Sequence, residues 1–470
     1  MASVLLAVGC ASVPITDYLS GGTVCHEHLT TAVAQNDQAF FRPTDQPYFA
    51  ISRLHANFDP QHLSSAAFSD WRSRVVTHSW QELAAAQQRD QGFAEAASRS
   101  CLVELAAFTP RESWQTYADA AADYDLYRDW QRWLGLYPLT APIAAWRIRL
   151  AQAQWLQEHG GPFDDPSIIA VHHYTPEPAA DAFPGPEDIT AWFTAAYADT
   201  PLGLPQLRPE QLARLITHHA PALELLMASE ADRLGSVAAS FDANERLRTH
   251  FDPAPATYVD TQYTQFDGVY YLQLAYSFWF PERRKSSVVD LTGGPWNGIT
   301  WRVTLDAQGQ PMWFDAVHNC GCYHHVWLPD HTEQRHDITG EEPLFLPYDW
   351  TGQPRLTLMP GDHFIRHVVS ADSAETRALT PPRQQGITPY ATEHYTILPY
   401  SSLLALPAGD EFYVSLFDHH GLVQESQRLE RFIMWPFGVR SAGAMRRNGT
   451  HAITFVGKRY FDDPRLFEAL

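Results

Sequence analysis

The sequence predicts an α+β protein with a helical N-terminal half followed by a mainly antiparallel, sandwich-like β C-terminal half. Residues 69–250 are rich in alanine, glutamine and glutamate, which favour helix. After Pro253 the chain changes to aromatic and β-branched runs that are separated by turn residues, as is typical of strands. Helices and strands that occupy separate parts of a chain indicate the α+β class.

Helical runs account for most of residues 80–250. Strong helix formers with few breakers fill these stretches, which are 80–97, 113–134, 142–158, 186–197 and 208–247. Pro209 is suited to the first turn of the last helix, since its φ is already helical. The proline-rich piece 174–186 is expected to be a loop, and residues 168–173 before it form a lone strand.

The β half is expected to begin with a long, mostly buried strand over 269–280 that ends at Pro281. Residues 299–305 and 311–317 predict a hairpin whose loop contains Gly309. Further strands are expected at 355–359, 363–369, 411–417 and 452–457.

The chain length predicts more than one domain, since 470 residues exceed the roughly 250–300 at which single cores stop growing. We expect a truncated lipoprotein signal at 1–10 and a tether with an irregular lead at 11–68. A helical domain at 69–250 and a mainly β domain at 251–470 follow.

The balance of charge is acidic, with 54 Asp and Glu against 33 Lys and Arg and a net charge of −21. Binding to phosphate backbones requires a basic surface. Nucleic acid is therefore not an expected partner.

The start of the chain resembles a bacterial lipobox, in which a short apolar run ends in a small residue and a lipidated cysteine. The residues that carry the resemblance are Leu5-Leu6-Ala7-Val8-Gly9-Cys10. The resemblance implies lipidation at Cys10 and a protein of the bacterial cell envelope, anchored to a membrane and facing the periplasm or the cell exterior. Because no basic region precedes the apolar run, we expect the true start to lie upstream.

The remaining cysteines are Cys25, Cys101, Cys320 and Cys322, an even set that three pairings can satisfy. Cys25 with Cys101 is the natural pair if Cys320 and Cys322 act together. A bridge across one glycine is strained and hence easily reduced.

The densest group of candidate ligands is the stretch 318–325, which holds two thiols and three imidazoles. In an extended segment His318, Cys320, Cys322 and His324 share one face. Sulfur and imidazole together suit zinc or copper, and zinc is the first choice because the chain has only six methionines and none beside the cluster. Ligands two apart on a strand lie about 6.5 Å from one another, so all four reach one ion only if the chain bends at Gly321. A disulfide between the cysteines and ordinary buried packing remain the alternatives.

A catalytic zinc would use three of these ligands and activate a water at the fourth position. Asp315, His325, His419 and His420 are the candidate proton acceptors. Asp418 is expected to orient His419 as carboxylate–imidazole pairs do.

A second candidate metal site lies at residues 21–29. The pattern Gly21-x-Thr23-x-x-His26-Glu27-His28-Leu29 resembles the opening strand of phosphotriesterase-like amidohydrolases. The resemblance implies a metal-dependent hydrolase with a (β/α)₈ barrel in which His26 and His28 bind zinc. Those enzymes also use a modified lysine, and Lys285 lies in no barrel-like unit of this sequence.

The C-terminal stretch is locally basic, and Arg440, Arg446 and Arg447 lie among small residues. Arginine forks match carboxylate and phosphate groups, so these three are the candidates for binding a small anionic ligand. Pairing with nearby acidic residues is the alternative.

Together these patterns predict a lipid-anchored envelope protein with a Cys/His zinc site in the β domain, with hydrolysis as one outcome. A non-catalytic ligand-binding or scaffold lipoprotein, with the same cysteines disulfide-bonded, and the amidohydrolase-like enzyme are the alternatives. The sequence leaves open whether the protein is an enzyme.

Overall fold

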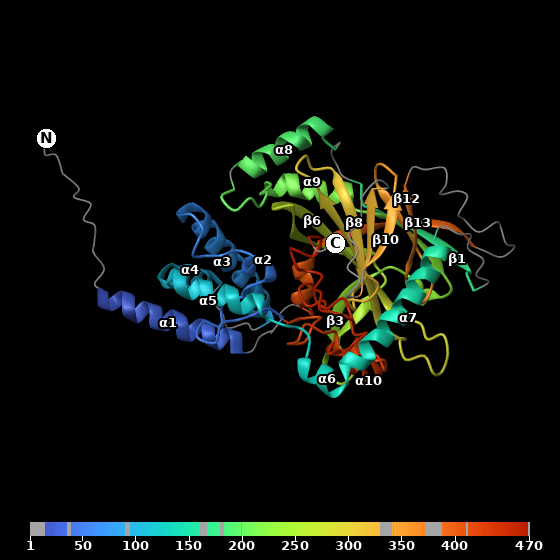
Figure 1. Ribbon diagram of the computed structural model, residues 1–470, viewed down its shortest axis with the longest axis horizontal. Helices are drawn as coiled ribbons and strands as arrows, with labels where there is room; N and C mark the ends of the chain where they lie inside the picture. Colours follow the sequence, from blue (N-terminus) through green and yellow to red (C-terminus); the bar gives the residue numbers. More distant parts are fainter. Residues whose placement is uncertain are drawn as a thin grey trace.

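A computed structural model describes residues 15–34, 39–89, 95–159, 167–178, 183–198, 200–329, 341, 343–371, 388–409 and 412–468. Figure 1 shows most helices gathered in the first third of the chain and one large sheet in the remainder. The protein is therefore α+β, as predicted. The lipobox with Cys10 lies outside the described residues.

The helices differ in role along the chain. Those before residue 123 form a helical cluster, α6 and α7 run along the other side of the molecule, and α8 and α9 cover the sheet (Figure 1). The helices are α1 (Ile15–Ala34), α2 (Arg53–Ala56), α3 (Ser65–Arg89), α4 (Glu95–Phe108), α5 (Arg111–Ala122), α6 (Asp129–Leu134), α7 (Tyr137–Glu158), α8 (Pro186–Ala198), α9 (Pro209–His219) and α10 (Arg431–Met434).

The helical cluster has its own apolar core. Trp71 of α3 and Trp114 of α5 are fully buried in it, and their rings meet edge to face with centroids 5.5 Å apart. Leu29 packs α1 into the same core. The Cys25–Cys101 disulfide joins α1 to α4, with the Cα atoms 5.2 Å apart. The predicted pairing of these two cysteines is therefore confirmed.

Eleven strands form one mixed sheet in the order β10-β9-β8-β7-β6-β5-β13-β1-β2-β11-β12. Its strands are β1 (Ala170–Pro176), β2 (Ala222–Met227), β5 (Ala256–Phe266), β6 (Val269–Arg283), β7 (Gly294–Leu305), β8 (Pro311–His318), β9 (His325–Pro329), β10 (Leu344–Tyr348), β11 (Pro354–Leu358), β12 (Ile365–Ser370) and β13 (Thr388–Pro399). Two small ribbons pair β3 (Ser236–Phe241) with β4 (Leu247–Asp252) and β14 (Leu406–Pro407) with β15 (Tyr413–Val414).

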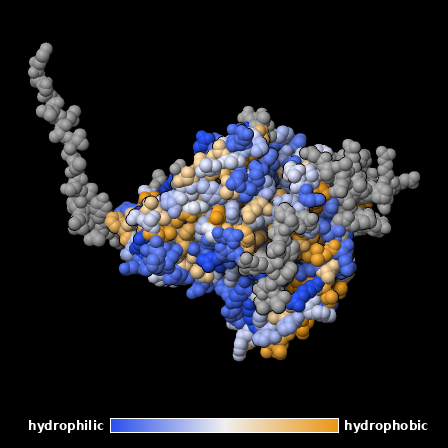
Figure 2. Space-filling model, turned by 45° about the horizontal axis from the view of Figure 1, so that its top comes forward, coloured by the Kyte–Doolittle hydropathy of each residue, from blue (hydrophilic) through white to orange (hydrophobic). Residues whose placement is uncertain are grey.

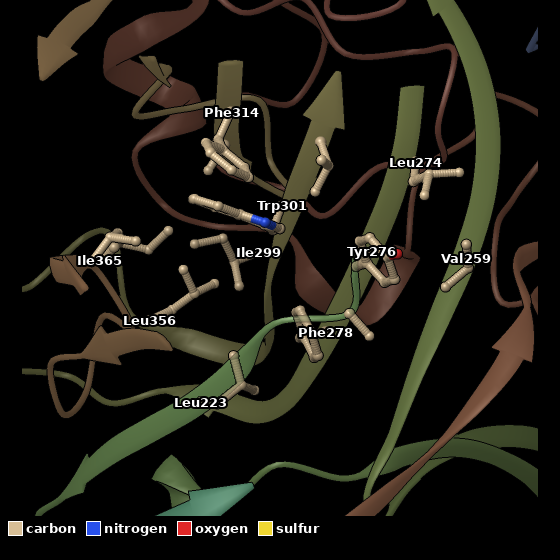
Figure 3. Close-up of a cluster of buried hydrophobic side chains, with 14 of the residues drawn as sticks. Leu223, Val259, Leu274, Tyr276, Phe278, Ile299, Trp301, Phe314, Leu356 and Ile365 are labelled. Carbon is tan, nitrogen blue, oxygen red and sulfur yellow. The ribbon is translucent and has the colours of Figure 1, made fainter. Parts of the chain in front are cut away.

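The main core lies on one face of this sheet. Side chains from strands far apart in the sheet order meet there, including Leu223 of β2, Ile299 and Trp301 of β7, Leu356 of β11 and Ile365 of β12 (Figure 3). Strands at the two ends of an open, flat sheet could not share one core, so the sheet curls around these side chains. Each of these five side chains is buried.

The predicted β elements are partly confirmed. The long strand is β6, although it continues past Pro281 to Arg283. The hairpin is β7 and β8, with Gly309 in its loop at φ +76°. Of the expected strand at 411–417, residue 411 lies outside the described residues, and Tyr413–Val414 are the strand residues among the described ones. Residues 452–457 form no strand and make only an isolated bridge between Ala452 and Tyr460.

The sheet also extends into the part of the chain that was expected to be helical. The predicted helix over 208–247 ends at His219, because Pro221 follows and the fully buried run Ala222–Met227 pairs as β2. β1 and β2 pair with β13 and β11, so one sheet spans position 250. The parallel pairings are β1 with β13, β2 with β11, β5 with β13 and β9 with β10. Parallel strands require long connections, because the chain must return to the same end of the sheet before the second strand begins.

None of the helices in the described ranges is both long and apolar enough to cross a membrane.

Candidate functional site: a pair of thiols beside a pocket

The connection from β8 to β9 is a tight turn that carries both C-terminal cysteines. The amide of Gly321 donates to the carbonyl oxygen of His318 at 2.7 Å, and the amide of His318 donates to that of Cys322 at 2.9 Å. Gly321 has φ +89°, and a Cβ there would lie 2.7 Å from the carbonyl oxygen of Ala452. Both the left-handed backbone and the close approach require glycine.

This turn holds two free thiols next to each other. Cys320 is buried and Cys322 is partly exposed. A hydrogen bond from the Cys322 thiol, together with nearby Arg283, lowers the pKa of Cys320. The same hydrogen bond and burial raise the pKa of Cys322 well above its ordinary value. When the pair loses one proton, Cys320 therefore becomes the thiolate and Cys322 keeps its proton.

Two buried arginines stabilise the turn and the residues beside it through hydrogen bonds to backbone carbonyl oxygens. The Nε of Arg446 donates to the carbonyl oxygen of Cys320 at 3.1 Å, and its amide donates to that of Asn319 at 2.6 Å. Arg428 donates to the carbonyl oxygens of Pro295 and Trp296 beside the turn. The positive charge of these arginines near the thiols favours the thiolate over the neutral thiol.

A pocket of about 410 Å³ opens over the turn. One wall is the inner side of α7, with Ile148, Ala151 and Trp155, and another is the C-terminal segment from Met434 to Phe455. Glu341 also lines the pocket, where burial raises its pKa to about 7 although it accepts hydrogen bonds from the amides of Phe455 and Val456. The pocket therefore combines the two thiols with apolar walls and a protonatable carboxyl group.

The four predicted zinc ligands do not converge on one point. His324 turns to Asp315, with Nε2 and Oδ2 3.3 Å apart, and Arg302 donates to both oxygens of that carboxylate at 2.9 and 2.7 Å. The side chain of His318 is buried, and neither ring nitrogen has a hydrogen-bond partner within the described ranges. Over those same ranges no three His, Cys, Asp or Glu side chains are grouped so that they could hold a metal ion. The tight turn ends the extended alternation on which the shared face depended.

The predicted proton acceptors are spread over three places. Asp315 is committed to the Arg302 ion pair, and both side chains are buried. His325 borders the pocket, and burial among aromatic rings lowers its pKa to about 3. His325 can therefore accept a proton only at very low pH.

Residues 418–420 form a separate turn. Oδ1 of Asp418 accepts the amides of His420 at 2.8 Å and Leu422 at 3.0 Å, so this carboxylate caps the backbone rather than orienting an imidazole. The rings of His419 and His420 contact each other, with centroids 3.8 Å apart.

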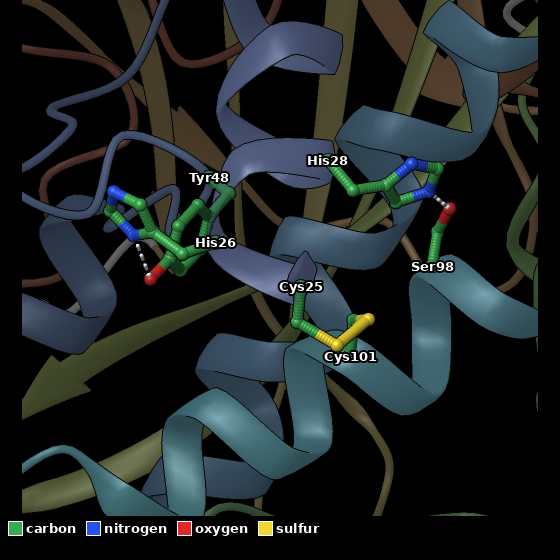
Figure 4. The surroundings of a disulfide bond; sticks show 6 residues. All are labelled: Cys25, His26, His28, Tyr48, Ser98 and Cys101. Carbon is green, nitrogen blue, oxygen red and sulfur yellow. Dashed lines mark hydrogen bonds between the residues drawn. A yellow bond between two sulfur atoms is a disulfide. The ribbon is translucent and has the colours of Figure 1, made fainter. Parts of the chain in front are cut away.

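His26 and His28 lie on α1 and not on a strand (Figure 4). Residues two apart on a helix point to nearly opposite sides, and the two rings lie on either side of the Cys25–Cys101 disulfide. His26 meets the hydroxyl of Tyr48 at 3.2 Å and His28 that of Ser98 at 3.1 Å. The opening strand that the amidohydrolase resemblance implied is therefore wrong, because a disulfide-bonded helix occupies this stretch.

The three predicted anion-binding arginines do not gather at one site. Arg446 is buried, and its guanidinium donates hydrogen bonds to carbonyl oxygens of the turn and of residues 440 and 441. Arg447 pairs with Glu82 of α3. Arg440 is half-buried and lies near Asp418. Two of the three guanidiniums therefore stabilise the fold.

Two parts of the pocket were not predicted from the sequence, namely the wall formed by α7 and the carboxyl group of Glu341. Trp155 sits in an ordinary helical pattern and Glu341 in a polar loop, so neither carries a local signal for a pocket. Arg428 and Glu430 precede the basic stretch with Arg440, Arg446 and Arg447 in the sequence, and only the fold brings them beside residues 295–322.

No protein family model matches this chain, and neither curated proteins nor solved structures gave a significant match.

Proposed function

We propose that this protein performs thiol–disulfide exchange at Cys320 and Cys322 on a small disulfide-containing molecule bound in the adjacent pocket. The observation that carries the proposal is the hydrogen bond between the two thiols, with the pKa of Cys320 lowered and that of Cys322 raised. Exchange begins with a thiolate, and a nearby second thiol resolves the mixed disulfide.

The reaction consists of two displacements. The Cys320 thiolate attacks one sulfur of the bound disulfide R–S–S–R, forming a Cys320–S–S–R bond and releasing one RS⁻, which takes a proton from Cys322. The Cys322 thiolate then attacks the sulfur of Cys320 and releases the second RS⁻, which takes a proton from water. The protein is oxidised by two electrons to the Cys320–Cys322 disulfide, and the small disulfide is reduced to two thiols.

The disulfide formed in this way is expected to be labile. A ring closed across a single glycine departs from relaxed disulfide geometry, so the bond is a good oxidant and is reduced readily. The turn at Gly321 already brings the two thiols within hydrogen-bonding range of each other. Such a pair therefore suits repeated exchange better than a permanent structural link.

The compartment proposed for this chemistry is the bacterial cell envelope, with the chain anchored through a lipid on Cys10. The lipobox resemblance supports this, and so does the Cys25–Cys101 disulfide, because such bonds persist in oxidising compartments. Expression with the upstream codons restored should give a membrane-fraction protein that becomes soluble when Cys10→Ser is made. A wild type that stays soluble would contradict the anchor.

The test of the exchange uses glutathione buffers of defined ratio and mass analysis after alkylation. We expect Cys320 and Cys322 to interconvert between dithiol and disulfide, and Cys322→Ser to accumulate a mixed disulfide with glutathione at Cys320. A variant with both Cys25→Ser and Cys101→Ser is the control, since it removes the distant disulfide without freeing a further thiol and leaves the thiol pair. A Cys320–Cys322 bond that no glutathione buffer reduces would support the scaffold alternative instead.

Zinc binding at the same turn is the second candidate, and it is favoured by the buried imidazole of His318, which has no hydrogen-bond partner among the described residues. Closing such a site requires His318 to move toward the thiols, since the residues are not grouped as ligands now. A zinc content near one equivalent that Cys320→Ser and His318→Asn both abolish would establish this candidate. Hydrolytic activity would follow only if water could complete the coordination of the metal.

A further inference from the structure

The outer side of α6 and α7 is apolar and exposed. Trp133 is 78% exposed and Ile143 is 64% exposed, although both are large hydrophobic residues. Leu139, Ile143, Trp146 and Leu150 are spaced by four, three and four positions, so they lie on one side of the helix. We call this surface the α6–α7 face.

The α6–α7 face is the side of α7 that the rest of the fold does not use. The opposite side of the helix, with Ile148, Ala151 and Trp155, lines the pocket over the thiol turn. The outward stripe therefore contributes nothing to the core described above, and its exposure needs another explanation.

Two neighbouring segments extend this face. Phe432 and Ile433 of α10 are 64% and 58% exposed, and Pro436, just after α10, lies against Gly135 at the end of α6. Val288 is fully exposed, in a loop tied to α10 by the hydrogen bond from the amide of Glu430 to the carbonyl oxygen of Leu291 at 3.0 Å. Figure 2 shows hydrophobic residues gathered at the lower end of the molecule, where Figure 1 places α6 and α10.

The charge around this face opposes that of the whole protein. The chain carries a net charge of −21, yet residues 130–157 contain no Asp or Glu. Arg147 and Arg149 are exposed on α7. Residues 283–289, in the neighbouring loop, add Arg284 and Lys285 and again no acidic residue. Positive charge therefore predominates around the apolar face, although Asp129 at the start of α6 is exposed and Asp290 follows the loop.

From these observations we infer that the α6–α7 face rests on the surface of an anionic lipid bilayer. An amphipathic helix with apolar and aromatic side chains on one side and arginines at its border lies in the interface of such a membrane. Tryptophans such as Trp133 and Trp146 suit the boundary between headgroups and acyl chains. The arginines then meet lipid phosphates.

A second copy of the chain fits this face less well. A two-fold dimer would place the same patch on both subunits, so Arg147 and Arg149 would face a surface that is also basic. Large contiguous apolar patches are rare on surfaces that stay in water. Lipid phosphate complements the basic border, whereas a second copy repeats it.

The experiment tests membrane contact in the absence of the lipid anchor. The Cys10→Ser full chain is mixed with vesicles of phosphatidylethanolamine and phosphatidylglycerol and with vesicles of phosphatidylcholine alone, and binding is measured by co-sedimentation. We expect binding to the anionic vesicles, and Trp133→Ser with Ile143→Ser and Trp146→Ser should weaken it at least about tenfold, since each removes apolar area from the interface. Arg147→Gln with Arg149→Gln should weaken the preference for anionic lipid.

The matched control replaces Val103 and Phe108 of α4 with serine, because these are exposed hydrophobic residues of a different helix. The control should bind as the parent does, and circular dichroism should show all variants folded. Absence of vesicle binding by the parent, or equal binding by the serine variants, would overturn the inference. A solution dimer that the same three substitutions dissociate would also overturn it and assign the face to a second copy. Because the anchor is absent throughout, a failure here leaves the anchoring and exchange proposals untouched.

Discussion

Arg446 and Cys320 are 126 positions apart, and the Nε of the arginine donates to the carbonyl oxygen of the cysteine at 3.1 Å. The same guanidinium also reaches the carbonyl oxygens of Arg440 and Ser441. One buried side chain thus ties the thiol turn to the C-terminal segment that forms a wall of the pocket.

Replacing Arg446 by methionine should lower the free energy of unfolding by about 2–4 kcal/mol, because several buried carbonyl oxygens lose their donors. Urea denaturation measures the loss. Arg431→Met is the control, since Arg431 is only partly buried and donates to a single carbonyl oxygen at 3.4 Å. A loss equal in both variants would contradict the role given to Arg446.

Gly321→Ala should destabilise the protein by about 2–3 kcal/mol more than Gly352→Ala, measured by thermal or urea unfolding. Both glycines have a left-handed backbone, with φ +89° and +83°. Only at Gly321 does an added Cβ meet a neighbour, the carbonyl oxygen of Ala452 at 2.7 Å, whereas at Gly352 nothing lies within 4 Å. Equal losses would show that the close approach costs nothing.

Asp315→Asn should lower the free energy of unfolding by about 3–5 kcal/mol, because it leaves the buried Arg302 without its counter-charge. Glu230→Gln breaks an ion pair whose carboxylate side chain is 86% exposed, and its cost should stay below about 1 kcal/mol. Chemical denaturation of the two variants gives the comparison. Should Asp315→Asn cost no more than Glu230→Gln, the buried pair does not hold β7 to β8.

Stability should fall as the pH drops below about 6.5. Burial lowers the pKa of His219, His325, His363 and His451 to about 3 in the folded protein, so these rings stay neutral while the unfolded chain takes up protons. Each lowered pKa contributes stability that is fully present above the unfolded value and is lost at up to about 1.4 kcal/mol per pH unit down to the folded value.

Urea unfolding at about pH 7.5 and about pH 5.5 measures this dependence. The pH dependence of stability should be weaker in His325→Phe, because phenylalanine does not titrate. Phenylalanine fits the site, since the His325 ring contacts Phe364 and Trp327 and its Nε2 has no hydrogen-bond partner in the described part of the chain. An unchanged slope in His325→Phe would show that the folded protein does not lower the pKa of His325.

The sequence by itself determined the local elements that have strong patterns. The aromatic run of β6, the β7–β8 hairpin with Gly309 and the proline at the start of α9 were all predictable, because periodicity and turn residues act over a few positions. The Cys25–Cys101 pairing was one of the options that the sequence left open, preferred on the condition that Cys320 and Cys322 act together. The chemistry-bearing stretch at 318–325 was recognisable from its composition alone.

Only the tertiary structure decided how those residues are used. β1 and β2 lie between helices, and their place in the sheet depends on pairing with strands more than 100 positions away. Of the predicted ligands, His324 lies against Asp315, and that carboxylate is paired with Arg302 on the neighbouring strand. The pocket over the thiols exists because α7 and the C-terminal segment are brought there from opposite parts of the chain. Long-range contacts of this kind leave no periodic signal in a sequence, because many different side chains can satisfy each one and only the assembled fold selects among them.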